Sequence, residues 1–243
     1  MDMGLNQTRR GFLRLTPAVA GGLILVGAGG SVPVLHGSAV TARAQDQEQG
    51  EEVSANEDLM REHGILNRVL LVYEAALGRL DGQQDVDPAV FASAAGIIRN
   101  FVEDYHERTE EQYLFPRFQQ AGTLVDLVTV LQQQHNAGRR VTDRILQSAT
   151  ADVRRDPSSR QALSSAIHQF IRMYRPHEAR EDTVLFPAFR KLVSPEEYDA
   201  LGDQFEARER QIFGGDGFDM ARDQVQALEQ QLGIYDLAQF TPA

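Results

Sequence analysis

The chain has 243 residues, enough for one or two domains with a buried core, and 42% of them are hydrophobic, as is typical of a globular protein. Its formal net charge of −11 argues against a nucleic-acid-binding surface, because phosphate binding needs an excess of Lys and Arg. The absence of cysteine excludes disulfides, thiolate metal sites and cysteine nucleophiles, and leaves His, Asp and Glu as the strong metal ligands.

Residues 1–44 have the order of charged, apolar and small residues that is typical of an export signal. The segment TRRGFLR (8–14) precedes a Gly- and Ala-rich apolar run, and ARA at 42–44 offers a small-x-small cleavage site. The paired arginines, with Phe and Leu shortly after them, resemble a twin-arginine signal. We expect export by the twin-arginine translocase to the periplasm, cell envelope or extracellular space. The alternatives are an uncleaved anchor and a misplaced start codon, and the run is too short and glycine-rich to favour a permanent transmembrane helix.

Beyond an acidic linker at 45–55, the sequence predicts helices joined by short turns, with little of the alternation that marks strands. Capping residues and Gly or Pro turn signals predict helices over about 56–80, 87–122, 123–150 and 156–193, then a fifth from 194 to the GGDG turn at 214–217 and a last amphipathic segment. Four long helices with short connections indicate an all-α, up-down-up-down four-helix bundle over 56–193. We expect residues 194–243 to form a C-terminal helical extension whose additional helices pack on the bundle.

Three prolines fall inside the predicted helices. We expect Pro116 and Pro187 to kink their helices or mark where they end, and Pro176 to bend the fourth helix near its middle.

One acidic, histidine-bearing segment occurs twice. YHERTEEQYLFPRF at 105–118 and PHEAREDTVLFPAF at 176–189 share the frame H-E-x-x-E-x-x-x-L-F-P-x-F. The histidines repeat as well, since one falls on each of the four long predicted helices with similar spacing in both halves. These histidines are His63, His106, His135 and His177. The chain therefore appears as two helix pairs related by duplication.

Each repeat places a glutamate four residues after its histidine, as Glu110 follows His106 and Glu181 follows His177. A four-residue step is about one helical turn, so both side chains project from one face, and ligands from four facing helices can converge in the core. Four imidazoles and two carboxylates suit iron, manganese or zinc better than calcium or magnesium. Two histidines for each of two ions, with two carboxylates that can bridge, describe a dinuclear site. The predicted metal ligands are His63, His106, Glu110, His135, His177 and Glu181.

Two simpler interpretations compete with a metal site: a local ion pair on a solvated helix face, and a motif kept by duplication for packing alone. Packing explains the repeated Leu-Phe pairs, but buried His and Glu cost several kcal/mol unless they are paired or metal-bound. His168 serves as a contrast, because nine residues before His177 it faces the opposite side of the helix, and we expect a structural role for it.

The ordered set H…H-x-x-x-E…H…H-x-x-x-E, with LFP after each H-x-x-x-E, resembles the hemerythrin-like (HHE cation-binding) family over residues 56–193. The resemblance implies a bundle that holds two non-haem iron ions with an oxo or hydroxo bridge, and favours iron over zinc or manganese. His63 and His106 would ligate one iron, His135 and His177 the other, and Glu110 and Glu181 would bridge them.

The oxygen carriers of that family have a further histidine where this chain has Arg139, so the resemblance is greater to the bacterial and iron-sensing branches. Water, Glu107, Glu178 or Asp182 are candidates to complete the metal shell.

These features predict an exported metal-binding protein that handles or senses oxygen, nitric oxide, peroxide or redox state. Twin-arginine substrates typically cross the membrane folded, which suits a protein that acquires its metal inside the cell. A ferritin-like di-iron oxidase or peroxidase is the first alternative, although that class uses Glu-x-x-His rather than His-x-x-x-Glu. A metal-free structural or adaptor bundle is the second. The amphipathic segments lack basic polar faces, so no stable membrane association is expected after cleavage.

Overall fold

The structure is a computed structural model that describes residues 53–82 and 84–242. The predicted export signal at 1–44 and most of the predicted linker lie outside the described residues. Within the described ranges the fold is all-α, and no helix there is both long enough and apolar enough to cross a membrane.

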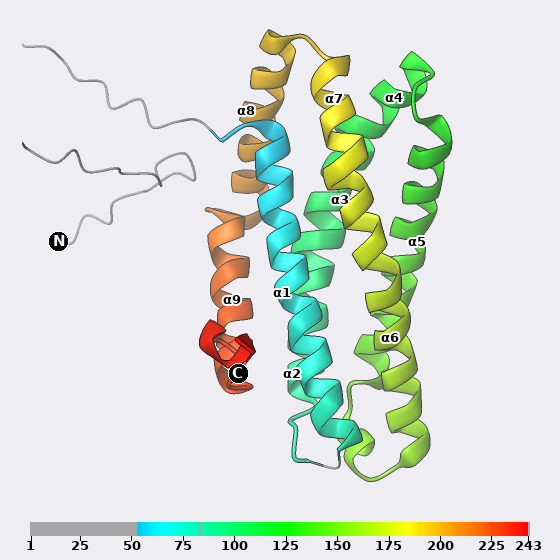
Figure 1. Ribbon diagram of the computed structural model, residues 1–243, viewed down its shortest axis with the longest axis vertical. Coiled ribbons are helices and arrows are strands. Elements are labelled where there is room, and N and C mark those ends of the chain that lie inside the picture. The colour runs from blue at the N-terminus through cyan, green and yellow to red at the C-terminus, as the bar shows by residue number, and fades with distance from the viewer. Residues whose placement is uncertain (1–52, 83, 243) are drawn as a thin grey trace, which may run out of the picture. The chain divides into compact units, whose positions relative to one another are not determined.

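The predicted four-helix bundle is confirmed, and its long helices lie side by side in Figure 1. The first is α1 (Ala55–Asp81), and the third is α5 (Val125–Ser148). The second runs through α2 (Ala89–Ile97), η2 (Ile98–His106), α3 (Glu107–Thr109), η3 (Glu110–Leu114) and α4 (Phe115–Ala121). A 3₁₀ turn, η4 (Ala151–Arg154), leads to the fourth, which runs through α6 (Pro157–Arg180), η5 (Glu181–Leu185) and α7 (Phe186–Leu192). The chain then continues through α8 (Pro195–Phe213), α9 (Gly217–Gln231) and the 3₁₀ turn η6 (Leu237–Phe240).

Local capping explains where the helices begin and end. The Ser54 hydroxyl accepts a hydrogen bond from the Glu57 amide, the Asp156 carboxylate accepts from two following amides, and the Ser194 hydroxyl accepts from the Glu197 amide. Each interaction satisfies amides that the first helical turn leaves free. The second helix ends at Gly122, whose φ of 64° is the left-handed conformation that glycine adopts without strain.

The second and fourth long helices contain π-helical turns, which the sequence did not predict. Pro116 and Pro187 each lie in the first turn of an α-segment that follows a π-segment, where a missing amide hydrogen costs least. α6 runs through Pro176 to Arg180. π-turns widen a helix locally and occur frequently at functional sites.

Apolar side chains form two separate clusters along the bundle. One contains Leu59, Phe115, Phe186 and their neighbours at the end formed by α4 and α7, and the other lies toward the opposite end and includes Tyr73 and Phe170. On each long helix the predicted ligands fall between residues of the two clusters. The core is therefore interrupted by a belt of buried His and Glu.

The C-terminal helices cover one side of the bundle: α8 contacts α1, and α9 contacts both α1 and α2 (Figure 1). A two-pronged ion pair fastens α9, because the Arg68 guanidinium donates to both carboxylate oxygens of buried Glu229, from Nε at 2.9 Å and from Nη2 at 2.5 Å.

Candidate metal centre

The structure brings all six predicted ligands together in the interior of the bundle. None is more than 4% exposed. The His63 and His106 Nε2 atoms are 3.0 Å apart, and the His135 and His177 Nε2 atoms are 3.2 Å apart. Two nitrogens bound in adjacent positions of one ion at about 2.1 Å lie about 3 Å from each other, so each histidine pair has the spacing of a shared metal ligand set.

The two glutamates lie between the histidine pairs. Glu110 Oε1 is 3.8 Å from His106 Nε2, and its Oε2 is 3.4 Å from His135 Nε2. Glu181 Oε2 is 3.4 Å from His63 Nε2 and 3.2 Å from His177 Nε2. Each carboxylate therefore reaches histidines of both pairs, and would bridge two ions if one were bound to each pair.

π-turns position several of these side chains. η2 ends at His106, η3 begins at Glu110 and η5 begins at Glu181. The extra residue in a π-turn changes the direction of the side chains that follow it, so it lets a long helix aim both members of a His-x-x-x-Glu pair at one point.

Every histidine of the set is oriented by its second ring nitrogen. Nδ1 lies 2.7 Å from Asp182 Oδ1 in His63 and 2.7 Å from Glu62 Oε2 in His106. It lies 3.1 Å from Glu111 Oε1 in His135 and 2.9 Å from Gln134 Oε1 in His177. An Nδ1–H that donates to such an oxygen leaves the Nε2 lone pair directed at the centre, as metal-bound histidines require.

The donor set fits divalent or trivalent cations held between the glutamates. Both oxygens of Glu110 and both of Glu181 are buried and accept no hydrogen bond from the described residues. Burial and the neighbouring Glu181 carboxylate raise the pKa of Glu110 well above its ordinary value. Burial disfavours the ionised form of Glu181, but the neighbouring His177 and His63 rings hold its pKa well below the ordinary value. Cations between the two glutamates would remove the repulsion between their buried carboxylates.

A sequence profile of the hemerythrin HHE cation binding domain matches residues 54–189, and matches again at 126–212. The chain belongs to the hemerythrin HHE cation-binding family. The second match begins 72 positions after the first, which is also the separation of His63 from His135, as the internal duplication predicts.

Uncharacterised proteins of Mycobacterium bovis and of two Mycobacterium tuberculosis strains are each 43% identical to this hemerythrin-type chain over 235 residues, covering 97% of it and 91% of each relative. No solved structure matches it significantly.

The candidates for an additional ligand in this hemerythrin domain have other partners. Asp182 lies on the Nδ1 side of His63. Glu178 accepts a hydrogen bond from the Asn67 amide at 2.9 Å, and Glu107 accepts one from the Tyr174 hydroxyl at 2.6 Å while it pairs with Arg139. These contacts give the three carboxylates partners other than the Nε2 atoms of the four histidines.

A second group of possible metal ligands lies next to the six and consists of Glu107, Glu111 and His135. Arg139 contacts the two carboxylates of this group. Its guanidinium lies 2.8 Å from a carboxylate oxygen of Glu107 and 2.8 Å from one of Glu111. An organic cation therefore already lies against both carboxylates of that group. His168 is exposed, as expected, and its Nδ1 lies 2.8 Å from the Ser164 carbonyl oxygen one turn earlier.

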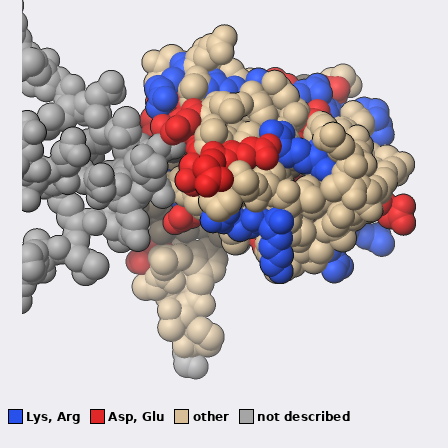
Figure 2. All heavy atoms as spheres, turned by 90° about the horizontal axis from the view of Figure 1, so that it is seen from above, with Lys and Arg blue, Asp and Glu red and all other residues tan. Residues whose placement is uncertain are grey.

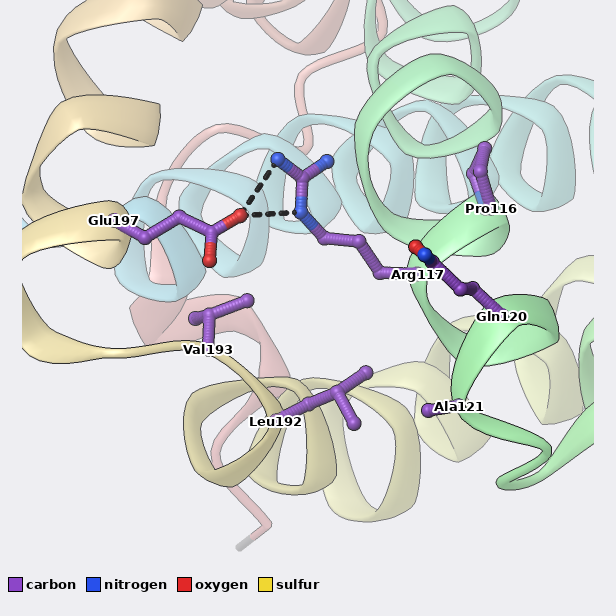
Figure 3. A pocket seen from close by; sticks show the side chains of 7 residues that line it. All are labelled: Pro116, Arg117, Gln120, Ala121, Leu192, Val193 and Glu197. Carbon is purple, nitrogen blue, oxygen red and sulfur yellow. Dashed lines mark hydrogen bonds and ion pairs between the residues drawn. The ribbon is translucent and has the colours of Figure 1, made fainter.

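A pocket of about 470 Å³ lies at the α4 and α7 end, away from the metal centre (Figure 3). Across the pocket, the Nε of Arg117 donates a hydrogen bond to Glu197 at 2.9 Å. None of the residues that line the pocket is one of the six predicted metal ligands. Acidic and basic side chains are interspersed on this end of the molecule (Figure 2).

Sequence reasoning did not predict the Nδ1 partners Glu62, Glu111 and Gln134. The duplication carried a usable signal for them. The residues directly before His63 and His135, and those directly after Glu110 and Glu181, occupy matching positions, and all of them have oxygen-bearing side chains.

Proposed function

We propose that the chain holds a non-haem di-iron centre of hemerythrin type and uses it to bind or sense oxygen, nitric oxide or peroxide. The observation that carries the proposal is the convergence of four imidazole Nε2 atoms on two buried carboxylates whose oxygens accept no hydrogen bond from the described residues. A mixed nitrogen and carboxylate set favours iron over calcium or magnesium. A ferrous pair bound there would supply an open coordination position and two electrons.

The chain itself would keep the site dry and fixed. The Phe186 ring stacks on His63 with centroids 5.5 Å apart, and Phe115 stacks on His135 at 5.4 Å. These two rings come from the repeated LFP segments and cover the centre from the same end of the bundle. Exclusion of water strengthens every electrostatic contact among the charged ligands.

The test is an absorption spectrum of the iron-loaded chain, recorded after dithionite reduction and again after exposure to air, nitric oxide or peroxide. We expect a ligand-dependent spectrum that His106→Ala and His177→Ala abolish and His168→Ala leaves intact. Reversal under vacuum would indicate a binding or sensing role, whereas turnover of added peroxide would favour the peroxidase alternative. A spectrum that does not respond to any of the three ligands contradicts the proposal.

We further propose that the protein works outside the cytoplasm, since the first 44 residues have the pattern of a twin-arginine export signal. Cell fractionation tests this proposal. The wild-type chain should appear in the envelope or exported fraction, and replacement of Arg9 and Arg10 by Lys should retain it inside the cell. Equal distribution of both chains would refute export by this route.

A further inference from the structure

The Nδ1 partners follow the duplication of the chain. Glu62 and Gln134 each precede the first histidine of a pair and contact the second histidine of that pair. Glu111 and Asp182 each follow a bridging glutamate and contact the first histidine of a pair. The shell around the centre is thus pseudo-symmetric, and its two halves can be compared residue by residue.

The first difference between the halves is a carboxylate against an amide. Glu62, only 2% exposed, places a carboxylate oxygen 2.7 Å from His106 Nδ1. At the matching position Gln134 places a neutral amide oxygen 2.9 Å from His177 Nδ1. A carboxylate acceptor increases the basicity of the imidazole it contacts more than an amide does.

The second difference is a guanidinium against an amide. Arg139 lies 2.8 Å from Glu111, the partner of His135, and offsets the charge of that carboxylate. At the position that matches Arg139 in the repeat, the chain has neutral Asn67, which donates to Glu178. Asp182, the partner of His63, corresponds to Glu111 in the repeat, but the position that would supply its cation is the neutral Asn67.

The remaining buried acids do not cancel these differences. Glu107 and Glu178 are matched positions, and the repeat gives them unequal partners: Arg139 lies 2.8 Å from Glu107 and offsets its charge, whereas Glu178 accepts a hydrogen bond from the neutral Asn67 amide. Glu103, one turn before His106, pairs with Arg99 at 3.1 Å. The His63 and His106 half therefore has two carboxylate partners, whereas the His135 and His177 half has one carboxylate offset by Arg139 and one neutral amide.

We infer that the two metal positions are unequal, and that the position of His63 and His106 binds the first cation and, of two cations of different charge, the more highly charged one. More negative charge close to the ligands attracts the cation more strongly, and partners behind the ligands change metal affinity by about 10–100-fold. This inference rests on the proposed function, since it presupposes a pair of bound ions.

The probe is Co²⁺ added stepwise to the metal-free full chain, followed by its visible absorption. We expect two binding steps. Glu62→Gln should weaken the tighter step by about 10–100-fold and leave the weaker one nearly unchanged, whereas Gln134→Glu should strengthen the weaker step by about 10-fold. Both substitutions are close in size to the original side chain, and circular dichroism confirms that the variants fold.

Assignment of the steps separates this inference from simple repulsion between two ions in identical positions. His177→Ala should keep the tighter step, and His106→Ala should keep only the weaker one. Equal effects of Glu62→Gln on both steps, or the opposite assignment, would overturn the inference while leaving the proposed function intact. A chain that binds no Co²⁺ and no iron would instead refute the proposed function.

Discussion

Gly138 lies in the middle of α5, one turn after His135, where a glycine ordinarily weakens a helix by about 1 kcal/mol relative to alanine. A Cβ built at this position would lie 2.0 Å from the Tyr174 hydroxyl oxygen and 2.8 Å from its Cζ. Tyr174 is 1% exposed, and its hydroxyl donates to buried Glu107 at 2.6 Å. The ring has no solvent to move into, so the glycine provides the space that the tyrosine occupies.

Gly138→Ala should therefore destabilise the protein despite the better helix propensity of alanine. Overpacking costs about 1–3 kcal/mol, and loss of the hydrogen bond to Glu107 costs about 1–3 kcal/mol more. Set against a gain of about 1 kcal/mol in helix propensity, the net loss in the free energy of unfolding is about 3 kcal/mol. The measurement is guanidinium unfolding of the metal-free chain, followed by circular dichroism.

Gly78 in α1 supplies the matched control, because a Cβ there meets nothing within 4 Å and the residue is exposed. Gly78→Ala should stabilise the protein by about 0.5–1 kcal/mol. In a Tyr174→Phe background the hydroxyl clash is gone, so Gly138→Ala should cost less than it does in the wild type. If Gly138→Ala is as stable as the wild type, the reasoning about Tyr174 is wrong.

Substitutions at three further positions test other features of the structure. Burial raises the pKa of Glu103 to about 7, so the folded state prefers its protonated form, and stability should fall by up to about 3 kcal/mol as the pH rises from 4.5 to 8. Glu103→Gln should make the decline between the two pH values smaller by up to about 3 kcal/mol, while Glu107 and Glu178, whose pKa burial also raises to about 7, keep their share of it. An unchanged pH dependence would contradict the assignment. Glu181→Ala should reduce the iron bound at both positions, because this carboxylate contacts histidines of both pairs. If metal analysis finds that the variant retains both ions, Glu181 does not bridge them. Arg68→Ala should lower the free energy of unfolding by about 2 kcal/mol, because it leaves Glu229 buried without its cation. Arg68→Lys should recover only part of that loss. Equal stability of the wild type and both variants would show that the ion pair does not hold α9 against the bundle.

Much of the bundle could be predicted because its helix boundaries are set locally. Ser54, Asp156 and Ser194 cap helices with their own side chains, and Gly122 ends one in a left-handed conformation, so a few adjacent residues suffice to locate each boundary. The six convergent residues could be predicted for a different reason, since duplication repeats the same chemistry at the same spacing.

The π-turns could not be predicted, because they depend on contacts between helices. A helix changes its hydrogen-bonding pattern there so that buried side chains point toward their partners on other helices. Glu110 and Glu181 each begin such a turn, and each lies against a histidine on another helix. The role of Asp182 was open for a similar reason. The sequence placed it beside the site, but only the packing of α1 against η5 places its carboxylate on Nδ1 of His63 rather than on the metal side.

The most direct test of a two-ion centre is the metal content of the full chain after reconstitution with ferrous iron and removal of unbound metal. Convergence of the six side chains on a pair of ions predicts about two irons per chain in the wild type and in His168→Ala, and a loss of iron in His106→Ala and His177→Ala. A wild-type chain that retains no iron, or variants that retain as much as the wild type, would contradict it.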